Sequence, residues 1–318
     1  MKFGLHLGTR GPAAEPDSLL RIARRAEALG FAHLGLSDHV VIAAAVDTEY
    51  PYTKSGTWFA QDTGVCLEQV TTLGFLAAAT TRLRLLTSVM VLPHRPVLLA
   101  AKMLATVDVL SKGRLTVGAG VGWMAEELAL LGAPPYKARG AASDEYIEAF
   151  RALWTEQRPA YAGRHVGFEG LLFAPKPVQR PHPPIWVGGE SPQARRRAGR
   201  LGDGWYPVIN NPAAPLDAPQ RYAAGLAEVR RHAEAAGRDA GALDAALYAI
   251  WFRLGEAETD REGARRPFTG SADAIAGDVA AYAEAGLKHL VIGFEARDEA
   301  DALARIEAFA DGVMARFA

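Results

Sequence analysis

The sequence has 318 residues, of which 49% are hydrophobic, so a single α/β domain over residues 1–318 can be built around one large core. Its 35 basic and 36 acidic residues give a formal net charge of -1, which argues against nucleic acid or an anionic membrane as a partner. One cysteine, Cys66, excludes an internal disulfide, and no spacing of Cys and His indicates a metal site. The chain enters a predicted strand at Lys2, with no secretory signal and no apolar run of membrane length, so we expect a cytoplasmic protein.

Strand and helix patterns alternate along the first 80 residues. Short apolar strands are predicted at 3–7 and 33–37, and helices at 17–29 and 67–80. Residues about 40–62 fit neither pattern and contain several aromatic side chains. Segments of this length without regular structure are usually functional or mobile in compact domains, so we predict an inserted surface loop here.

The stretch from Arg82 to Gly122 reads as one β-α-β unit. Residues 83–92 show almost no polar alternation, which is typical of a strand buried on both faces in a parallel sheet. A helix follows from Pro96 to about residue 111, and a second buried strand is predicted at 114–121. Ser88 interrupts the first strand, and Gly118, Gly120 and Gly122 lie near the end of the second. At such positions the backbone can approach a flat ligand closely.

The second half of the chain continues the alternation after a looser region. Helices are predicted at 123–131, 142–154, from Ser191-Pro192 onward, and at 219–236, 271–285 and 298–317. Strands are predicted at 184–189, 204–209, 247–254 and 289–294. Residues 156–184 are rich in Gly, Pro and Arg, and we expect a second insertion there with a minor hairpin near 171–173.

Eight strands that alternate with helices predict a closed (β/α)8 TIM barrel. An open doubly wound sheet is disfavoured because no GxGxxG motif follows the first strand. Chemistry in such barrels lies at the carboxyl ends of the strands. The residues predicted there are His6, Asp38, His39, Ser88, Val89, Gly120, Gly122, Gly188, Gly189, Ser191, Trp205, Tyr206, Arg253 and Glu295. Glycines and aromatic rings with few charges suit a planar cofactor better than a metal ion.

At these positions the sequence resembles the bacterial luciferase-like monooxygenases, and within them the subgroup that uses the deazaflavin coenzyme F420. The resemblance rests on LGLSDHV at 34–40, LLTSVMVLPHRP at 85–96, SKGRLTVGAGVGWMAEEL at 111–128, PPIWVGGES at 183–191, LGDGWYPV at 201–208 and AGLKHLVIGF ending at 294. It implies a barrel with inserted segments, a homodimer, and a flavin lying in the barrel mouth.

The resemblance also implies residue roles. Ser88-Val89 matches a non-prolyl cis peptide and bulge that press against the middle of the flavin ring. Asp38 and His39 match a pair beside the reactive ring edge, where the histidine acts as acid or base. The cradle for the phosphate-bearing tail is formed by Gly188, Gly189 and Ser191, at a helix N-terminus suited to an anion.

Two departures from the family pattern bear on the substrate. Trp123 stands where members that oxidise sugar phosphates carry a catalytic acid, and no lysine follows Trp205 at the position of their phosphate ligand. A sugar phosphate is therefore disfavoured. An apolar or aromatic substrate is expected instead, beside Trp58, Trp123, Trp205 and Tyr206.

Each candidate residue has a structural alternative. His39 could be a structural histidine, and Asp38 could cap the loop that follows it. The Ser88 hydroxyl could bond a neighbouring backbone group, and the pair Gly188-Gly189 could form a plain tight turn. All of these stay open on the sequence alone.

The expected activity is hydride transfer between deazaflavin carbon C5 and a small organic substrate, with His39 giving or taking the proton. Two alternatives stay open. One is an FMN-dependent monooxygenase on the same fold, and the other is a non-catalytic flavin-binding protein.

Overall fold

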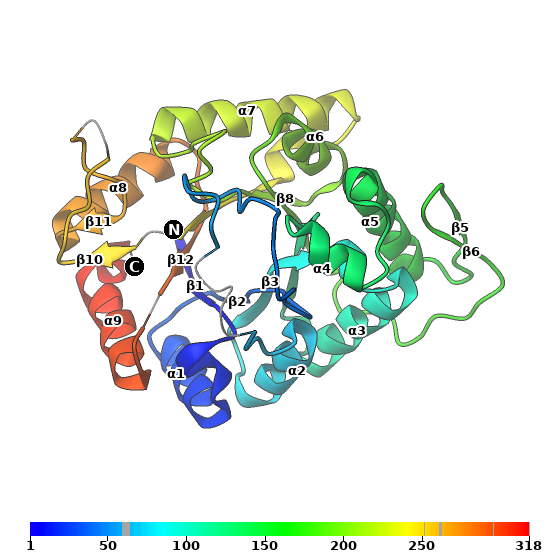
Figure 1. Cartoon of the computed structure of the whole chain (residues 1–318), viewed down its shortest axis with the longest axis horizontal. Coiled ribbons are helices and arrows are strands. Elements are labelled where there is room, and N and C mark those ends of the chain that lie inside the picture. Colours follow the sequence, from blue (N-terminus) through cyan, green and yellow to red (C-terminus); the bar gives the residue numbers. More distant parts are fainter. Residues whose placement is uncertain (59–63, 251, 261–262, 295, 318) are drawn as a thin grey trace.

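Eight parallel strands close into a barrel at the centre of the molecule. The computed structural model describes residues 1–58, 64–250, 252–260, 263–294 and 296–317 (Figure 1). The barrel order is β1-β12-β9-β8-β7-β4-β3-β2, with β1 hydrogen-bonded to β12 on one side and to β2 on the other. The barrel strands are β1 (Lys2–Leu7), β2 (His33–Leu36), β3 (Arg84–Val91), β4 (Leu115–Gly120), β7 (Ile185–Gly188), β8 (Gly204–Tyr206), β9 (Asp244–Ala249) and β12 (His289–Gly293). The predicted TIM barrel is confirmed.

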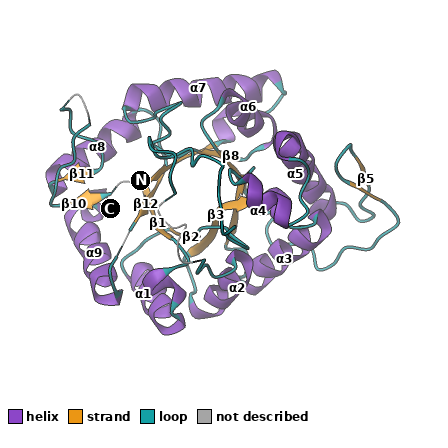
Figure 2. Ribbon diagram, viewed as in Figure 1, coloured by secondary structure: helices purple, strands orange, loops and turns teal. Residues whose placement is uncertain are grey.

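Helices surround the barrel as an outer ring (Figure 2). They are α1 (Pro16–Ala28), α2 (Gln69–Ala79), α3 (Val97–Leu110), α5 (Arg139–Thr155), α6 (Pro192–Leu201), α7 (Pro219–Ala235), α8 (Ala272–Glu284) and α9 (Glu299–Gly312). The short helix α4 (Ala125–Leu130) lies inside this ring in the view of Figure 2. Short 3-10 turns lie at Gly11–Ala14, Leu92–His94, Tyr136–Ala138, Ala240–Ala242 and Met314–Phe317. Every helix in the described ranges is too short or too polar to cross a membrane.

The two regions predicted as insertions differ in structure. Between β2 and α2, the described residues 37–58 and 64–68 form neither helix nor strand. Between α5 and β7, the strands β5 (Tyr161–Ala162) and β6 (Gly167–Phe168) form a small antiparallel hairpin. The hairpin predicted near 171–173 thus lies earlier in the chain, and residues 171–173 themselves form no strand.

The seventh barrel strand begins earlier than the apolar pattern predicts. Its pairing starts at Asp244, opposite Gly204, and the strand ends at Ala249. Residues Arg253–Leu254 form a separate strand, β10, which pairs with β11 (Thr269–Gly270) outside the barrel. Arg253 is half exposed there and pairs with Glu258, so its predicted place at the barrel mouth is wrong. The prediction for Glu295 falls outside the described residues.

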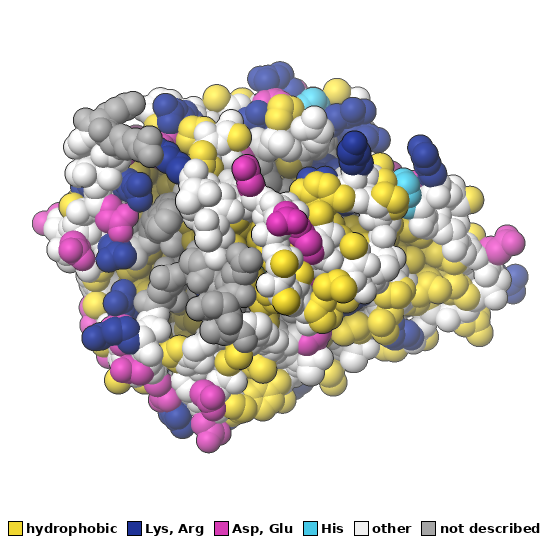
Figure 3. Space-filling model, viewed as in Figure 1, with side chains coloured by type: hydrophobic (Ala, Val, Ile, Leu, Met, Phe, Trp, Pro, Cys, Tyr) yellow, Lys and Arg dark blue, Asp and Glu magenta, His cyan; other side chains and the backbone are white. Residues whose placement is uncertain are grey.

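Apolar side chains gather over α2, α3 and α4 on the right half of the face in Figure 3. Phe75 on α2 and Leu98 and Leu99 on α3 are each at least 40% exposed. Exposed apolar patches of this kind are typical of protein interfaces. The homodimer expected from the sequence stays a prediction.

Candidate functional site

A cavity of about 1040 Å³ opens at the carboxyl ends of the barrel strands. Of the predicted mouth residues it is lined by His6, Asp38, His39, Ser88, Val89, Gly120, Gly122, Gly188, Gly189, Ser191 and Tyr206, and by Trp58 and Trp123 of the predicted substrate pocket. It is large enough for a ring cofactor together with a small substrate. No group of three or more His, Cys, Asp or Glu side chains placed to hold a metal occurs in the described residues.

The Ser88-Val89 peptide bond is cis, as the resemblance implies, and it lies in a β-bulge between Thr87 and Met90. The Ser88 hydroxyl lies 2.8 Å from the Tyr206 hydroxyl, so its partner is a side chain of β8 and not the neighbouring backbone. The Val89 side chain lies over the glycines of the next two strands. A Cβ on Gly120 would lie 2.5 Å from Val89 Cγ2, and one on Gly188 would lie 3.1 Å from its Cγ1. These glycines therefore make room for the bulge as well as lining the cavity.

One end of the cavity is suited to an anion. Ser191 caps α6, since its hydroxyl accepts a hydrogen bond from the Ala194 amide at 3.1 Å, and Gly189 precedes this cap with a φ of +104°. Arg197 donates to the Gly140 carbonyl at 2.8 Å, which brings the segment containing Lys137 and Arg139 to the same end. Helix N-termini and basic side chains together bind phosphate groups well. The residues present therefore fit the phosphate-bearing tail of a flavin.

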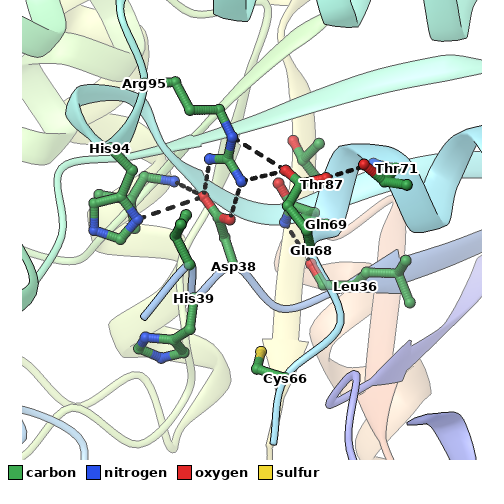
Figure 4. A network of polar contacts seen from close by, with 12 residues as sticks. Leu36, Asp38, His39, Cys66, Glu68, Gln69, Thr71, Thr87, His94 and Arg95 are labelled. Carbon is green, nitrogen blue, oxygen red and sulfur yellow. Dashed lines mark hydrogen bonds and ion pairs between the residues drawn. The ribbon is translucent and has the colours of Figure 1, made fainter. Parts of the chain in front are cut away.

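Asp38 is engaged with the protein itself. Its Oδ1 accepts a hydrogen bond from Arg95 at 2.8 Å, and its Oδ2 accepts from Arg95 and from the Val91 amide, both at 2.9 Å (Figure 4). Arg95 also donates to Glu68. Burial alone would lower the pKa of Arg95, but the two carboxylates raise it above its usual value. Asp38 therefore ties the end of β2 to the end of β3. Asp38 thus has a structural role. Its partners are Arg95 and Val91, and not the loop after Asp38 that the sequence suggested.

His39 is held by a carboxylate that the sequence did not reveal. Its Nδ1 lies 2.7 Å from Glu127 Oε2, while Glu127 Oε1 accepts hydrogen bonds from the amides of Val40 at 2.7 Å and Val41 at 3.2 Å. His94 is buried next to them, with its ring nitrogens 3.8 Å from Asp38 Oδ2 and from Glu127 Oε2. Burial, the largest cause, lowers the pKa of His94, which favours a neutral ring.

Aromatic rings surround His39. The Trp58 ring lies 4.5 Å from the His39 ring between centroids, and the Trp123 ring lies 6.4 Å away. Tyr50 packs on Trp123 with centroids 5.0 Å apart. The inserted loop after β2 thus brings Tyr50 and Trp58 against the turn that leads into α4. The resulting wall is largely aromatic, and His39 and Glu127 border it.

Trp205 does not line the cavity, and its prediction as a pocket residue is wrong. Its indole is fully buried outside the barrel and stacks on Tyr222 of α7 with centroids 5.5 Å apart. Neighbouring residues of a strand point to opposite faces, so Trp205 points outward and Tyr206 points into the barrel. The indole N–H donates to the Gly189 carbonyl at 2.9 Å, so Trp205 stabilises the Gly188-Gly189 turn from outside the cavity.

The cavity floor carries a second histidine. His6 Nδ1 lies 2.9 Å from the Tyr248 hydroxyl, and His6 Nε2 lies 3.4 Å from the Ser37 hydroxyl. Burial is the main cause that lowers the pKa of His6 to about 4. The ring is therefore neutral near pH 7, and it serves as a polar part of the floor.

Four functional candidates were missed from the sequence: His94, Arg95, Glu127 and Tyr248. Three of them stand inside the segments that carry the family resemblance, at 85–96 and 111–128. Their partners are distant along the chain, so no local spacing indicates the contacts.

Comparisons with known proteins show the family of this chain. The model of the luciferase-like monooxygenase family matches residues 1–318. The "Uncharacterized protein Rv0953c" of Mycobacterium tuberculosis is 34% identical over 294 residues, which cover 89% of this chain and 96% of that protein. The FMNH2-dependent dimethylsulfone monooxygenase of Pseudomonas putida is 38% identical over 141 residues, 44% of this chain and 38% of that enzyme.

Among solved structures, the coenzyme F420 dependent tetrahydromethanopterin reductase from Methanopyrus kandleri has the same fold, with a TM-score of 0.79 at 17% identity. The match covers 100% of this chain and 99% of that one. The family match spans the whole chain, and the cis peptide, the bulge and the cavity lie where the family resemblance places them. The chain belongs to the luciferase-like monooxygenase family.

Proposed function

We propose that the protein is an F420-dependent oxidoreductase that transfers a hydride between the deazaflavin and a small apolar or aromatic alcohol or carbonyl compound. The observation that carries this proposal is the His39–Glu127 pair, 2.7 Å apart, in an aromatic wall of the cavity. Interconversion of an alcohol and a carbonyl compound moves a hydride at carbon and a proton at oxygen. A histidine beside the substrate oxygen can give or take this proton.

The cofactor would be held by residues from several strands. Val89 of the bulge would support the ring, while Gly188, Gly189 and the start of α6 would receive the anionic tail. When bound, the deazaflavin gives or takes a hydride at ring carbon C5. His39 gives or takes the accompanying proton at the substrate oxygen.

The substrate would lie against aromatic side chains. Trp58 and Trp123 flank His39, and both line the cavity. Glu127 is poorly placed to bind a charged substrate beside these rings, because it is buried and its oxygens are occupied by His39 and two backbone amides. An uncharged substrate with an apolar or aromatic body therefore fits this wall best.

A second candidate is an FMN-dependent monooxygenase. The similarity to the dimethylsulfone monooxygenase of Pseudomonas putida, which is described as FMNH2-dependent, favours it. A glycine turn at a helix N-terminus suits the phosphate of FMN as well as the tail of the deazaflavin. Cofactor preference therefore has to be measured.

The first experiment titrates the purified protein with coenzyme F420 and, separately, with FMN, and follows fluorescence quenching. We expect micromolar or tighter binding of F420 and weaker binding of FMN. The opposite preference, with oxygen-dependent consumption of reduced flavin, would favour the monooxygenase. Binding without turnover of any alcohol, ketone or enone would favour a flavin-binding protein.

The second experiment replaces His39. The His39→Ala variant should keep its affinity for F420 and lose turnover by roughly 10²-fold or more, since general acid–base catalysis contributes that much. His232→Ala, on the outer helix α7, is the matched control and should keep full activity. Unchanged turnover in His39→Ala would remove His39 from the mechanism.

A further inference from the structure

Glu127 occupies an unusual position for a glutamate. It lies in the first turn of α4 and is 1% exposed, yet it belongs to a segment that borders the open cavity. Its Oε1 accepts hydrogen bonds from two consecutive backbone amides, Val40 and Val41, and its Oε2 faces His39 Nδ1. Both carboxylate oxygens are thus aligned by partners from the segment just after β2.

The charge state of Glu127 decides what His39 can do. Burial would raise the pKa of this carboxyl, but the hydrogen bonds from His39 and the Val40 amide lower it below its usual value. An ionised carboxylate can only accept hydrogen bonds. The proton of a neutral His39 ring must then be on Nδ1, and Nε2 keeps its lone pair.

The other titratable groups around His39 do not compete for this bond. His94 Nε2 is 3.8 Å from Glu127 Oε2, beyond hydrogen-bonding distance. Asp38 already accepts three hydrogen bonds, two from Arg95 and one from the Val91 amide, and no hydrogen bond joins it to His39 in the described part of the chain. Burial is the main cause that raises the pKa of Cys66, which keeps the nearby thiol protonated. Glu127 is therefore the group that selects the ring nitrogen.

We infer that Glu127 is a positioning residue, which fixes the proton of His39 on Nδ1 and so presents Nε2 to the substrate as the base. The inference rests on the proposed function, in which His39 exchanges a proton with the substrate oxygen. In alcohol oxidation the hydroxyl proton would pass to Nε2, and the imidazolium formed would face the Glu127 carboxylate. Such carboxylate partners set histidine tautomers in many enzymes.

The variant Glu127→Gln should reverse the tautomer. Its amide oxygen is needed by the two N–H groups of Val40 and Val41, because the opposite orientation would set an NH2 group against two donors. The NH2 group then faces His39 Nδ1 and makes that nitrogen an acceptor. The ring proton moves to Nε2, which can no longer act as a base.

The neighbouring residue Glu126 provides a matched control. Its Oε1 accepts hydrogen bonds from the amides of Asp47 and Thr48, both at 3.0 Å, so it anchors the same inserted loop to the same helix. No hydrogen bond or ion pair joins Glu126 to His39 in the described structure. Glu126→Gln therefore weakens the anchoring of the loop without changing the partner of the imidazole.

The test combines spectroscopy and kinetics. Long-range ¹H–¹⁵N spectra of the ¹⁵N-histidine-labelled full chain, recorded without cofactor and at a pH where the ring is neutral, report the tautomer of His39; His39→Ala assigns the signals. We expect the Nδ1–H form in the wild type and in Glu126→Gln, and the Nε2–H form in Glu127→Gln. With F420 and benzyl alcohol as a small aromatic alcohol, kcat of Glu127→Gln should fall roughly 10²-fold or more, with an unchanged dissociation constant for F420. Glu126→Gln should stay within a few-fold of the wild type.

Two results would overturn the inference. One is an Nε2–H tautomer in the wild type. The other is an unchanged tautomer in Glu127→Gln, whatever its turnover, which would make Glu127 only a loop anchor. Because the spectra need no cofactor, they decide the role of Glu127 even if F420 proves to be the wrong cofactor. Failure of the proposed function would show separately, as absent F420 binding in the wild type.

Discussion

Replacing Asp38 by alanine should destabilise the protein even when no cofactor is present. The Asp38 side chain is fully buried and bonds the guanidinium of Arg95 through both oxygens. Its removal leaves a buried positive charge with one partner, Glu68, and leaves the Val91 amide without its acceptor. Breaking such a buried pair costs about 3–5 kcal/mol of unfolding free energy. For 318 residues this corresponds to a decrease in Tm of roughly 4–8 °C.

The assay is urea and thermal unfolding of Asp38→Ala and wild type at pH 7, followed by circular dichroism. Glu68→Gln is the matched control, because it removes the other carboxylate of Arg95 at a partly exposed position. That variant should lose less than about 1 kcal/mol. The reasoning would be refuted if Asp38→Ala unfolded like the wild type but lost its affinity for F420 or FMN. Asp38 would then be a cofactor ligand and not part of the framework.

Two further predictions concern the cavity floor and the bulge. Unfolded His6 takes up a proton near pH 6.5 whereas folded His6 does so only near pH 4, so the unfolding free energy should fall as the pH drops through this window. His6→Gln should reduce that slope by up to about 1.4 kcal/mol per pH unit in urea unfolding, and an unchanged slope would contradict a neutral His6. Gly120→Ala places a Cβ 2.5 Å from Val89 and should cost about 1–3 kcal/mol, again measured by urea unfolding. Gly74→Ala, in α2 with no atom within 4 Å of the new Cβ, should instead stabilise the protein by about 0.5–1 kcal/mol.

The barrel could be predicted because its strands are buried on both faces and its helices carry periodic apolar positions. β3 and β4 illustrate this, since nearly every residue of both strands is buried. The seventh strand was placed too late because Asp244 is charged and Ala245 and Ala246 are only weakly apolar. Their place in the barrel is decided by parallel pairing with β8 and β12, which a local pattern does not contain.

Side-chain direction limited the prediction of the pocket. Trp205 and Tyr206 are adjacent aromatic residues at the end of one strand, and composition alone does not tell which of them points inward. The strand pairs Trp205 with Val187 and Tyr206 with Gly188. Of the two, only Tyr206, which pairs with Gly188, points into the cavity. Gly188 has no side chain, and this leaves space for Val89 of the bulge.

The polar framework of the site could not be predicted, because its contacts join residues far apart in sequence. His39 and Glu127 are separated by 88 positions, and Asp38 and Arg95 by 57. Asp38 and His39 are adjacent, yet they bind different partners. Asp38 points toward Arg95 and locks two strand ends, while His39 points toward Glu127 and borders the cavity. The adjacent pair therefore divides into a structural residue and a candidate base. Stability measurements should respond to the first position and turnover to the second, so the two roles can be separated by experiment.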